Sequence, residues 1–383
     1  MNRPHFSAFF RNLLTACCVL FSVVPVGSAF AGEIVVGQFS IASGVFAGTS
    51  QEILLGAKLW FDHVNAQGGV NGQKIRLAVV HGGYDSAEGV KLTEQMIDKE
   101  KPVALIGYPG TAILNELVKN GLLERSRIPL ISPYSGSSGV RTYPWFFHIR
   151  ATYTEEAAYV VEHVATLGIK KVAVLYQDDG FGQSVLPAFE AAAAKYGIQI
   201  VARGTYTNAK PDTSLAAQTI RAANPSAVVL IASTKPAATF IKEYKQAGGN
   251  AMIFGVSTVD STGLVAQNGR DLVRGVAVTQ IVPYPFSGVS KLVKEFQADF
   301  KQYAPAKAVV TYTVFEQYIG ARLLVEALQR AGKNPSAAKV AEVLAGIGKV
   351  DIGGFALQYS SGNRSGSHFV DLTVIGPEGQ LMR

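Results

Sequence analysis

The chain repeats one pattern twice, in which short apolar runs rich in β-branched residues alternate with amphipathic stretches. In the first series, apolar runs and helical patterns alternate over residues 34–39, 52–64, 75–80, 87–98, 103–107, 112–124 and 128–132. In the second series, helical patterns and apolar runs alternate over residues 155–167, 172–176, 183–195, 198–201, 215–223, 227–231, 237–247, 252–256 and 276–280. Nearly continuous apolar strands that alternate with helices are typical of parallel sheets covered on both faces. The sequence therefore predicts an α/β fold with two doubly wound parallel-sheet lobes.

The C-terminal part breaks this alternation. Three helical patterns, at 291–303, 311–331 and 335–345, follow one another with no strand between them. Because they come after the second series, we expect them to pack back onto the first lobe. The two later runs, 355–359 and 369–375, alternate like strands of an antiparallel edge.

The N-terminus has the form of a secretory signal. Arg3 and Arg11 precede an apolar run over residues 13–26, and the small residues Ala29 and Ala31 flank Phe30. A charged start, a short apolar core and an A-x-A exit predict cleavage after Ala31 and a periplasmic mature protein. The apolar run is shorter than the ~20 residues of a membrane span.

Cysteine usage and charge exclude several classes of function. Cys17 and Cys18 both lie in the predicted signal, so the mature chain has no thiol for a disulfide or a metal. Cys17 ends a stretch that resembles a lipoprotein acceptor site, but only five residues separate it from Arg11, too few for an apolar core. The signal holds two arginines and no acid, which leaves the mature net charge at +5. Without a basic cluster, nucleic acid is not an expected partner, and no later apolar run predicts stable membrane insertion.

Small polar residues follow most of the predicted strands. These exits are 40–49, 107–111, 132–138, 177–182, 232–234, 257–258 and Gln280. Open parallel sheets bind ligands beyond the carboxyl ends of their strands. Backbone N–H groups freed by glycine, a helix N-terminus and a hydroxyl form a cradle of the size of an anion, and we expect Thr111 to cap the helix at 112–124. Ordinary turn chemistry explains any one such loop, but their recurrence in both series predicts a cleft for a polar small-molecule solute.

Catalytic and metal-binding patterns are weak in this sequence. The stretch 136–139 is one residue short of G-x-S-x-G, and no histidine stands at metal-ligand spacing with another histidine or an acid. No phosphate-binding glycine motif follows a strand. We therefore expect no catalytic residue, no metal and no cofactor.

The stretch 34–98, with its Val-Asn-Ala-Gln-Gly-Gly-Val-Asn-Gly element at 64–72, carries a recognisable pattern, as do 129–150 and 174–184. This pattern resembles the type I periplasmic binding proteins of the leucine/isoleucine/valine-binding class. The resemblance implies a three-crossing hinge, with crossings near 150–152, 280–283 and 353–355. The first lobe would then comprise 33–150 and 284–352, and the second 151–283 and 353–383. The resemblance also implies that the chain is the substrate-binding component of an ABC importer, with a membrane permease as partner. The alternative is a periplasmic ligand-sensing subunit of a membrane signalling system.

The same resemblance implies a ligand site. In the class, the first-lobe loops hold an amino-acid carboxylate, and the candidate residues of this chain are Phe46, Gly110, Thr111, Tyr134, Ser135, Tyr153, Phe181, Ser233, Ser257 and Gln280. The chain departs from the class at Ser257, where an acidic residue pairs with the ligand's ammonium. This leaves the ligand open between a small amino acid and an organic or aromatic acid, amide or urea-like solute. Asp178 and Asp260 are the acids that could supply the charge instead.

Overall fold

A computed structural model describes residues 32–286 and 288–383. The predicted signal peptide, its cleavage after Ala31 and the question of Cys17 therefore lie outside the described residues. The elements of the first series are β1 (Ile34–Ile41), α1 (Ala47–Ala66), β2 (Ile75–Gly82), α2 (Ser86–Glu100), β3 (Ala104–Ile106), α3 (Thr111–Asn120), α4 (Leu122–Ser126), β4 (Leu130–Ile131), the 3-10 helix η1 (Ser138–Val140) and β5 (Phe146–Phe147).

The second series and the C-terminal part contain the expected elements in the expected order, and in addition α9, α10, β11 and β14, which were not predicted. Their elements are α5 (Tyr153–Thr166), β6 (Lys171–Gln177), α6 (Gly180–Lys195), β7 (Gln199–Tyr206), α7 (Ser214–Ala222), β8 (Ala227–Ile231), α8 (Thr234–Gln246), β9 (Met252–Gly255), α9 (Ser261–Asn268), α10 (Arg270–Val273), β10 (Ala277–Gln280), α11 (Lys291–Tyr303), α12 (Tyr312–Ala331), α13 (Ala337–Gly346), β11 (Lys349–Asp351), β12 (Ala356–Gln358), β13 (Asp371–Ile375) and β14 (Leu381–Met382). The expected helix at 112–124 is divided into α3 and α4 because Gly121 takes a left-handed conformation, with φ 68°.

The two main sheets share one topology. The first sheet has the order β2-β1-β3-β4-β5 and is parallel throughout. The second has the order β14-β13-β10-β9-β8-β6-β7, in which β6 to β10 repeat the same winding in parallel. In each sheet the strand order therefore reverses beside the first strand of the series, between β1 and β3 and between β6 and β8. Ligands of such sheets bind at these switch points.

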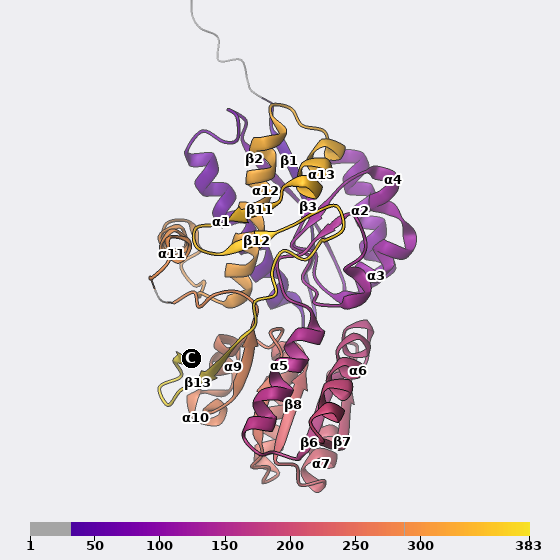
Figure 1. Cartoon of the computed structure of the whole chain (residues 1–383), viewed down its shortest axis with the longest axis vertical. Coiled ribbons are helices and arrows are strands. Elements are labelled where there is room, and N and C mark those ends of the chain that lie inside the picture. The colour runs from indigo at the N-terminus through magenta and orange to yellow at the C-terminus, as the bar shows by residue number, and fades with distance from the viewer. Residues whose placement is uncertain (1–31, 287) are drawn as a thin grey trace, which may run out of the picture. The chain divides into compact units, whose positions relative to one another are not determined.

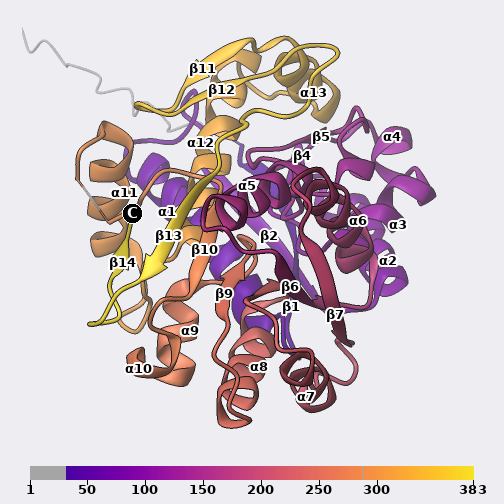
Figure 2. The ribbon, with the colours of Figure 1, turned by 60° about the horizontal axis from the view of Figure 1, so that its bottom comes forward.

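The last strands complete the second sheet. β13 pairs antiparallel with β10, and β14 pairs with β13, as the alternation at 369–375 predicted (Figure 2). The run expected at 355–359 does not join that edge: β12 pairs antiparallel with β11 in a separate hairpin. The sequence showed no strand at β11, because three residues are too few for an alternation to be read.

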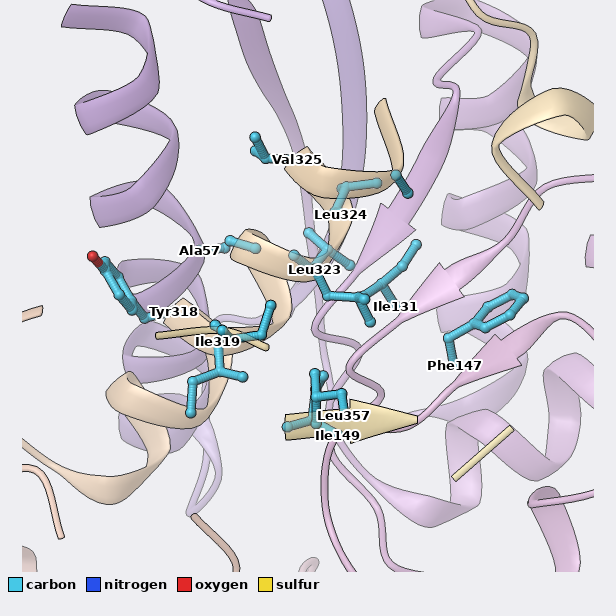
Figure 3. Packing of buried hydrophobic residues seen from close by; sticks show 14 of the residues in the cluster. Ala57, Ile131, Phe147, Ile149, Tyr318, Ile319, Leu323, Leu324, Val325 and Leu357 are labelled. Atoms are coloured by element: carbon cyan, nitrogen blue, oxygen red, sulfur yellow. The ribbon is translucent and has the colours of Figure 1, made fainter. Parts of the chain in front are cut away.

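The long helix α12 forms the centre of the first lobe. It lies beside α1 (Figure 1), and a Cβ atom on Gly56 would come within 2.2 Å of the Val314 carbonyl oxygen, so glycine is required at this crossing. Figure 3 shows the apolar side chains of α12 between Ala57 of α1, Ile131 of β4 and Leu357 of β12. The three C-terminal helices thus pack onto the first lobe, as their position after the second series suggested.

The chain passes between the two lobes three times. Residues 148–152 make the first crossing, and the second begins at residue 281, directly after β10. The third crossing differs from the expectation of 353–355, because Leu357 and Tyr359 are buried in the core of the first lobe. The chain leaves that core only after Tyr359, and His148 and Ser365 form a parallel bridge between the first and third crossings.

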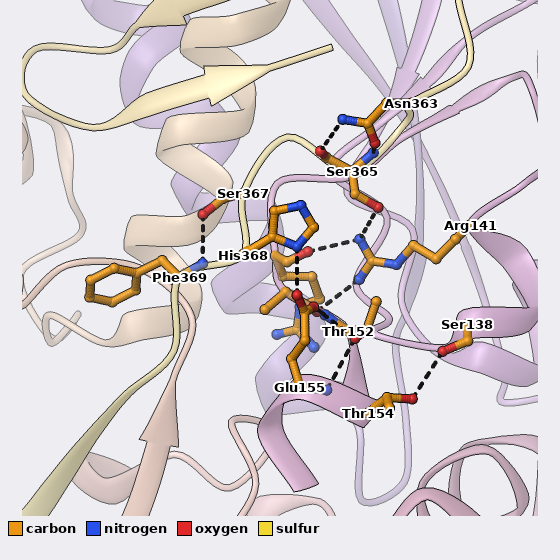
Figure 4. A network of polar contacts seen from close by, with 12 residues as sticks. Ser138, Arg141, Thr152, Thr154, Glu155, Asn363, Ser365, Ser367, His368 and Phe369 are labelled. Atoms are coloured by element: carbon orange, nitrogen blue, oxygen red, sulfur yellow. Dashed lines mark hydrogen bonds and ion pairs between the residues drawn. The ribbon is translucent and has the colours of Figure 1, made fainter. Parts of the chain in front are cut away.

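A polar network joins these two crossings (Figure 4). Arg141 donates from Nη1 and Nη2 to the carbonyl oxygens of Arg150 and Ala151, both at 2.8 Å, and from Nη1 to Ser365 Oγ at 3.3 Å. Burial lowers the pKa of Arg141 to about 10, so its guanidinium remains charged at neutral pH. The His368 ring lies 2.5 Å from Glu155 Oε1, at the capping box that begins α5.

Candidate functional site

The strand exits of both sheets meet in one small pocket, most of which the surrounding side chains fill. Its lining residues are Phe46, Tyr84, Gly110, Thr111, Tyr134, Tyr153, Gln177, Phe181, Ser233 and Thr258. Phe46 and Gly110 follow β1 and β3, and Gln177 and Ser233 end or follow β6 and β8. Both topological switch points therefore contribute directly to the pocket. Ser135, Ser257 and Gln280, predicted as contacts, do not line it.

The first-lobe face is built around the start of α3. Gly110, with φ 89°, is the N-cap residue and supplies no side-chain cap, so the expectation that Thr111 caps this helix is wrong. Thr111 is the first helical residue, and its Oγ1 lies 2.8 Å from Ser135 Oγ. Ser135 Oγ also accepts from the Ser137 N–H at 3.2 Å, so Ser135 holds Thr111 in place from behind the pocket. A helix N-terminus without a side-chain cap favours a bound anion.

Aromatic rings form the walls of the pocket. The ring of Phe46 lies 5.8 Å from that of Tyr84 and 6.2 Å from that of Tyr134. Tyr153 and Phe181 form an edge-on pair at 5.1 Å. Edge-on and tilted aromatic pairs of this kind stabilise a packed apolar wall. The pocket therefore offers apolar surface to the body of a ligand.

A buried ion pair supports the Tyr134 wall. Arg150 and Glu316 form two hydrogen bonds of 2.9 and 3.0 Å, and both side chains are 1% exposed. The Arg150 guanidinium carbon lies 4.3 Å from the centre of the Tyr134 ring, a cation–π contact. Burial raises the pKa of Tyr134, so its hydroxyl stays protonated beside Thr313 Oγ1 at 3.1 Å. The ring is thus held by charge on one side and by a hydrogen bond at its tip.

The second-lobe face has one pocket hydroxyl without a partner. Gln177 Oε1 accepts from Tyr206 at 3.0 Å, and Thr258 Oγ1 donates to the Ala232 carbonyl oxygen at 2.8 Å. The Ser233 side chain is 2% exposed, yet its Oγ has no hydrogen-bond partner among the described residues. A buried hydroxyl without a partner carries a desolvation penalty that a ligand could relieve.

Tyr84 is a pocket residue that the sequence did not reveal. Its hydroxyl donates to Asp179 Oδ2 at 2.9 Å, and Gln177 Nε2 donates to the same oxygen at 2.6 Å. This contact joins the loop after β2 to the N-terminus of α6, across the two lobes. Burial and the neighbouring Asp179 charge raise the pKa of Tyr84. Its only sequence signal was its place two residues after β2, in a loop without the hydroxyl cluster of the other exits.

Hydrogen bonds to a buried carboxylate explain why Ser257 does not line the pocket. Its N–H and its hydroxyl both donate to Glu156, at 2.8 and 2.9 Å, and Thr279 donates to the same carboxylate at 2.5 Å. Burial raises the pKa of Glu156, while the Arg150 charge opposes that shift. An acid therefore does stand next to residue 257, but protein donors occupy both of its oxygens. Gln280 donates instead to Thr373 of β13, at 2.9 Å, and so belongs to the pairing of β10 with β13 inside the second sheet.

The two acids considered as substitutes for an ammonium partner differ in exposure. Asp178 is exposed, and Asp260 is 9% exposed at the N-terminus of α9. Of the two, the structure therefore favours Asp260 as a buried charge near the pocket.

The pocket combines neutral donors and acceptors with apolar walls. The described residues contain no group of three or more His, Cys, Asp or Glu side chains placed to hold a metal ion. In the same part of the chain, no helix combines the length and apolarity that a membrane span requires.

Comparison with known proteins agrees with this geometry. An amino acid binding protein of Pseudomonas aeruginosa is 24% identical over 340 residues, which cover 88% of each chain. The Leu/Ile/Val-binding protein homolog 3 of Brucella melitensis is 23% identical, over 87% of this chain and 89% of its own. The crystal structure of a substrate-binding periplasmic protein from Ralstonia solanacearum superposes with a TM-score of 0.88 at 31% identity, covering 91% of this chain and 99% of its own. The periplasmic binding protein family model matches residues 33–379, and the chain belongs to that family.

Proposed function

We propose that this protein is the substrate-binding component of an ABC importer. It binds a small amino acid or an organic or aromatic acid in the pocket of Phe46, Thr111, Tyr134, Phe181 and Ser233, and delivers it to a membrane permease. The pocket that carries this proposal is the one where the switch points of both sheets meet. The names of the Pseudomonas and Brucella relatives support a ligand of the amino-acid class.

The arrangement of the pocket supports an anionic end and an apolar body in the ligand. The start of α3, together with Thr111, would hold a carboxylate, since backbone N–H groups and the helix dipole both favour negative charge there. The rings of Phe46, Tyr134 and Phe181 would then enclose the rest of the solute. Ser233 Oγ would gain from the ligand the hydrogen bond that it lacks in the protein.

We also propose that the protein is exported to the periplasm. Residues 1–31 would direct the chain to the periplasm and be removed after Ala31. The mature protein would then work as two lobes on three crossings. A ligand that contacts both lobes only when they close would shift the population towards the closed form.

Two measurements test this function. Mass spectrometry of the purified protein should identify a co-purifying solute, and calorimetry should find a ligand among leucine, phenylalanine, 4-methylpentanoate and 3-phenylpropanoate. Small-angle scattering with saturating ligand should then show a smaller radius of gyration. A protein that binds one of these solutes but keeps its radius of gyration would contradict the hinge mechanism. Turnover of the bound solute by the pure protein would contradict a pure binding role.

A further inference from the structure

Three buried polar side chains in the centre of the first lobe lack hydrogen-bond partners among the described residues. Gln38 lies on β1, Gln317 lies on α12 and Ser132 follows β4, and all three are 0% exposed. Both amide atoms of each glutamine and the hydroxyl oxygen of the serine are without a partner. Each such atom carries its full desolvation penalty, so a group of them in one part of a core requires an explanation.

The two amides converge on the backbone of Gly107, the residue that follows β3. A Cβ atom placed on Gly107 would lie 3.0 Å from Gln38 Nε2 and 3.0 Å from Gln317 Oε1. These two amide atoms are therefore at most 6.0 Å apart, and no hydrogen bond joins them. One water molecule that accepts from the first atom and donates to the second, with bonds of about 2.9 Å, can bridge such a distance.

The Ser132 hydroxyl lies against the same face of α12. A Cβ atom on Gly320 would come within 2.9 Å of Ser132 Oγ, and Gly320 stands three residues after Gln317, on the same side of the helix. The Ser132 N–H donates to the Phe147 carbonyl oxygen at 2.9 Å, which fixes the backbone of the serine to the sheet. The hydroxyl is thus held towards α12 by the protein without being bonded by it.

Water is the ligand whose chemistry fits these groups. Two amides and a hydroxyl offer both donors and acceptors and carry no net charge. An internal water typically makes about three hydrogen bonds to buried polar groups that would otherwise be unsatisfied. We infer that Gln38, Gln317 and Ser132 enclose an internal hydration site behind the loop that follows β3. None of the three lines the ligand pocket, so the inference does not depend on the proposed function.

The sign of a stability change tests the inference. Gln38→Met and Gln317→Met keep the length of the side chain and remove its amide. In a hydrated site, each substitution removes a partner of the shared water, so each should lower the midpoint of urea unfolding. The double variant should lose less than the sum of the two, because both single variants disrupt the same water. In a dry site each substitution would raise the midpoint, since it removes a buried group that has no partner, and that result would overturn the inference.

Ser132→Ala separates a shared water from a direct bond between the two amides. The alanine keeps a Cβ atom and removes only the hydroxyl, so the midpoint should fall, and the loss should be coupled to that of Gln317→Met. Coupling between the two glutamines alone, with no effect of Ser132→Ala, would indicate a direct amide–amide bond and would refute the hydration site. Gln218→Met, at an exposed position of α7, is the matched control and should leave the midpoint unchanged.

A crystal structure of the protein gives the direct observation. Ordered density should lie within hydrogen-bond distance of Gln38, Gln317 and Ser132, and a structure without such density would contradict the inference even if a variant fails to fold. Unfolding midpoints of the wild type in potassium, sodium and choline chloride at equal ionic strength should agree. Specific stabilisation by potassium or sodium would assign the site to that ion instead of water.

Discussion

The two faces of the pocket differ in how completely the protein satisfies them. On the first lobe, Thr111 is bonded to Ser135, Tyr134 to Thr313, and Arg150 to Glu316 behind the wall. On the second lobe, the buried oxygens Ser233 Oγ and Asp260 Oδ1 have no partner among the described residues. The polar side chains of the first face are therefore bonded within the protein, where only the start of α3 lacks a side-chain cap, while two buried oxygens of the second face have no partner among the described residues. If the proposed function is right, the solute would meet a preorganised first lobe, and the second lobe would gain hydrogen bonds from it on closure.

The largest expected effect concerns the buried ion pair of Arg150 and Glu316, which supports the first face. Glu316→Gln removes one charge of a buried pair and leaves Arg150 uncompensated, so the free energy of unfolding should fall by about 3–5 kcal/mol. Urea denaturation would measure this change. As a control, Glu94→Gln removes the partner of Arg125 in an exposed pair and should cost less than about 1 kcal/mol. Similar losses in both variants would mean that the buried pair does not support the first face.

The next test concerns the first face as an anion site. Thr111→Val keeps the shape of the side chain and removes its hydroxyl. If that hydroxyl meets a ligand carboxylate, calorimetry with the tightest of the four compounds should show an affinity loss of about 1.5–3 kcal/mol. Because Gly110 rather than Thr111 is the N-cap, loss of a cap cannot explain such an effect. A loss below about 0.5 kcal/mol would remove Thr111 from the ligand contacts.

The pH dependence of stability tests the unsatisfied second face. The folded-state pKa of Asp260, about 6, lies above its ordinary value of 3.8, so the folded protein retains a proton that the unfolded chain has lost. Stability should therefore fall as the pH rises from about 4 to about 6, and the loss should persist at neutral pH. Asp260→Asn keeps a capping side chain and removes the charge, so it should gain about 1–3 kcal/mol at pH 7.5 and little at pH 4.

Urea denaturation at the two pH values would measure this gain. Asp178→Asn is the control, since that surface position should change stability by less than about 0.5 kcal/mol at either pH. An equal gain for Asp260→Asn at both pH values would show that its effect does not come from the carboxylate charge.

The smallest effect, expected at Ser233, has opposite signs with and without ligand. Ser233→Ala removes a buried hydroxyl that has no partner, so the empty protein should be as stable as the wild type or more stable by up to about 1 kcal/mol. The same substitution should weaken ligand binding by about 0.5–1.5 kcal/mol. Thermal unfolding and calorimetry would give the two values. A clear loss of stability in the empty protein would show that the second face is already satisfied.

Local patterns in the sequence predicted the elements well where they are long or periodic. The helix at 291–303 was predicted with the bounds of α11, and the strand at 227–231 with those of β8. Both rest on apolar periodicity, which is a local property. The strand predicted at 355–359 exists as β12, but β11 and the pairing of the two were missed, because β11 is three residues long and the hairpin packs on the first lobe through contacts distant in sequence.

The site was predictable where a strand exit lies at a switch point. Gly110, Thr111 and Ser233 follow β3 and β8, so the general rule for open sheets located them. Tyr84 could not be located in that way, because β2 is an edge strand and its exit contains no hydroxyl cluster. The prediction of Gln280 as a ligand contact was wrong although it ends a strand. The antiparallel strand β13, from the end of the chain, pairs with β10, and Thr373 of β13 accepts a hydrogen bond from the Gln280 side chain.

The guanidinium of Arg141 has a mechanical consequence. One rigid, planar group bonds to carbonyl oxygens at 150 and 151 and to the hydroxyl of Ser365, on two separate connecting segments. Neither segment can bend by itself without lengthening a bond to the other. A motion of the two lobes on these segments would therefore have to bend both of them together. The proposed opening would thus be constrained by Arg141, a side chain that does not line the pocket.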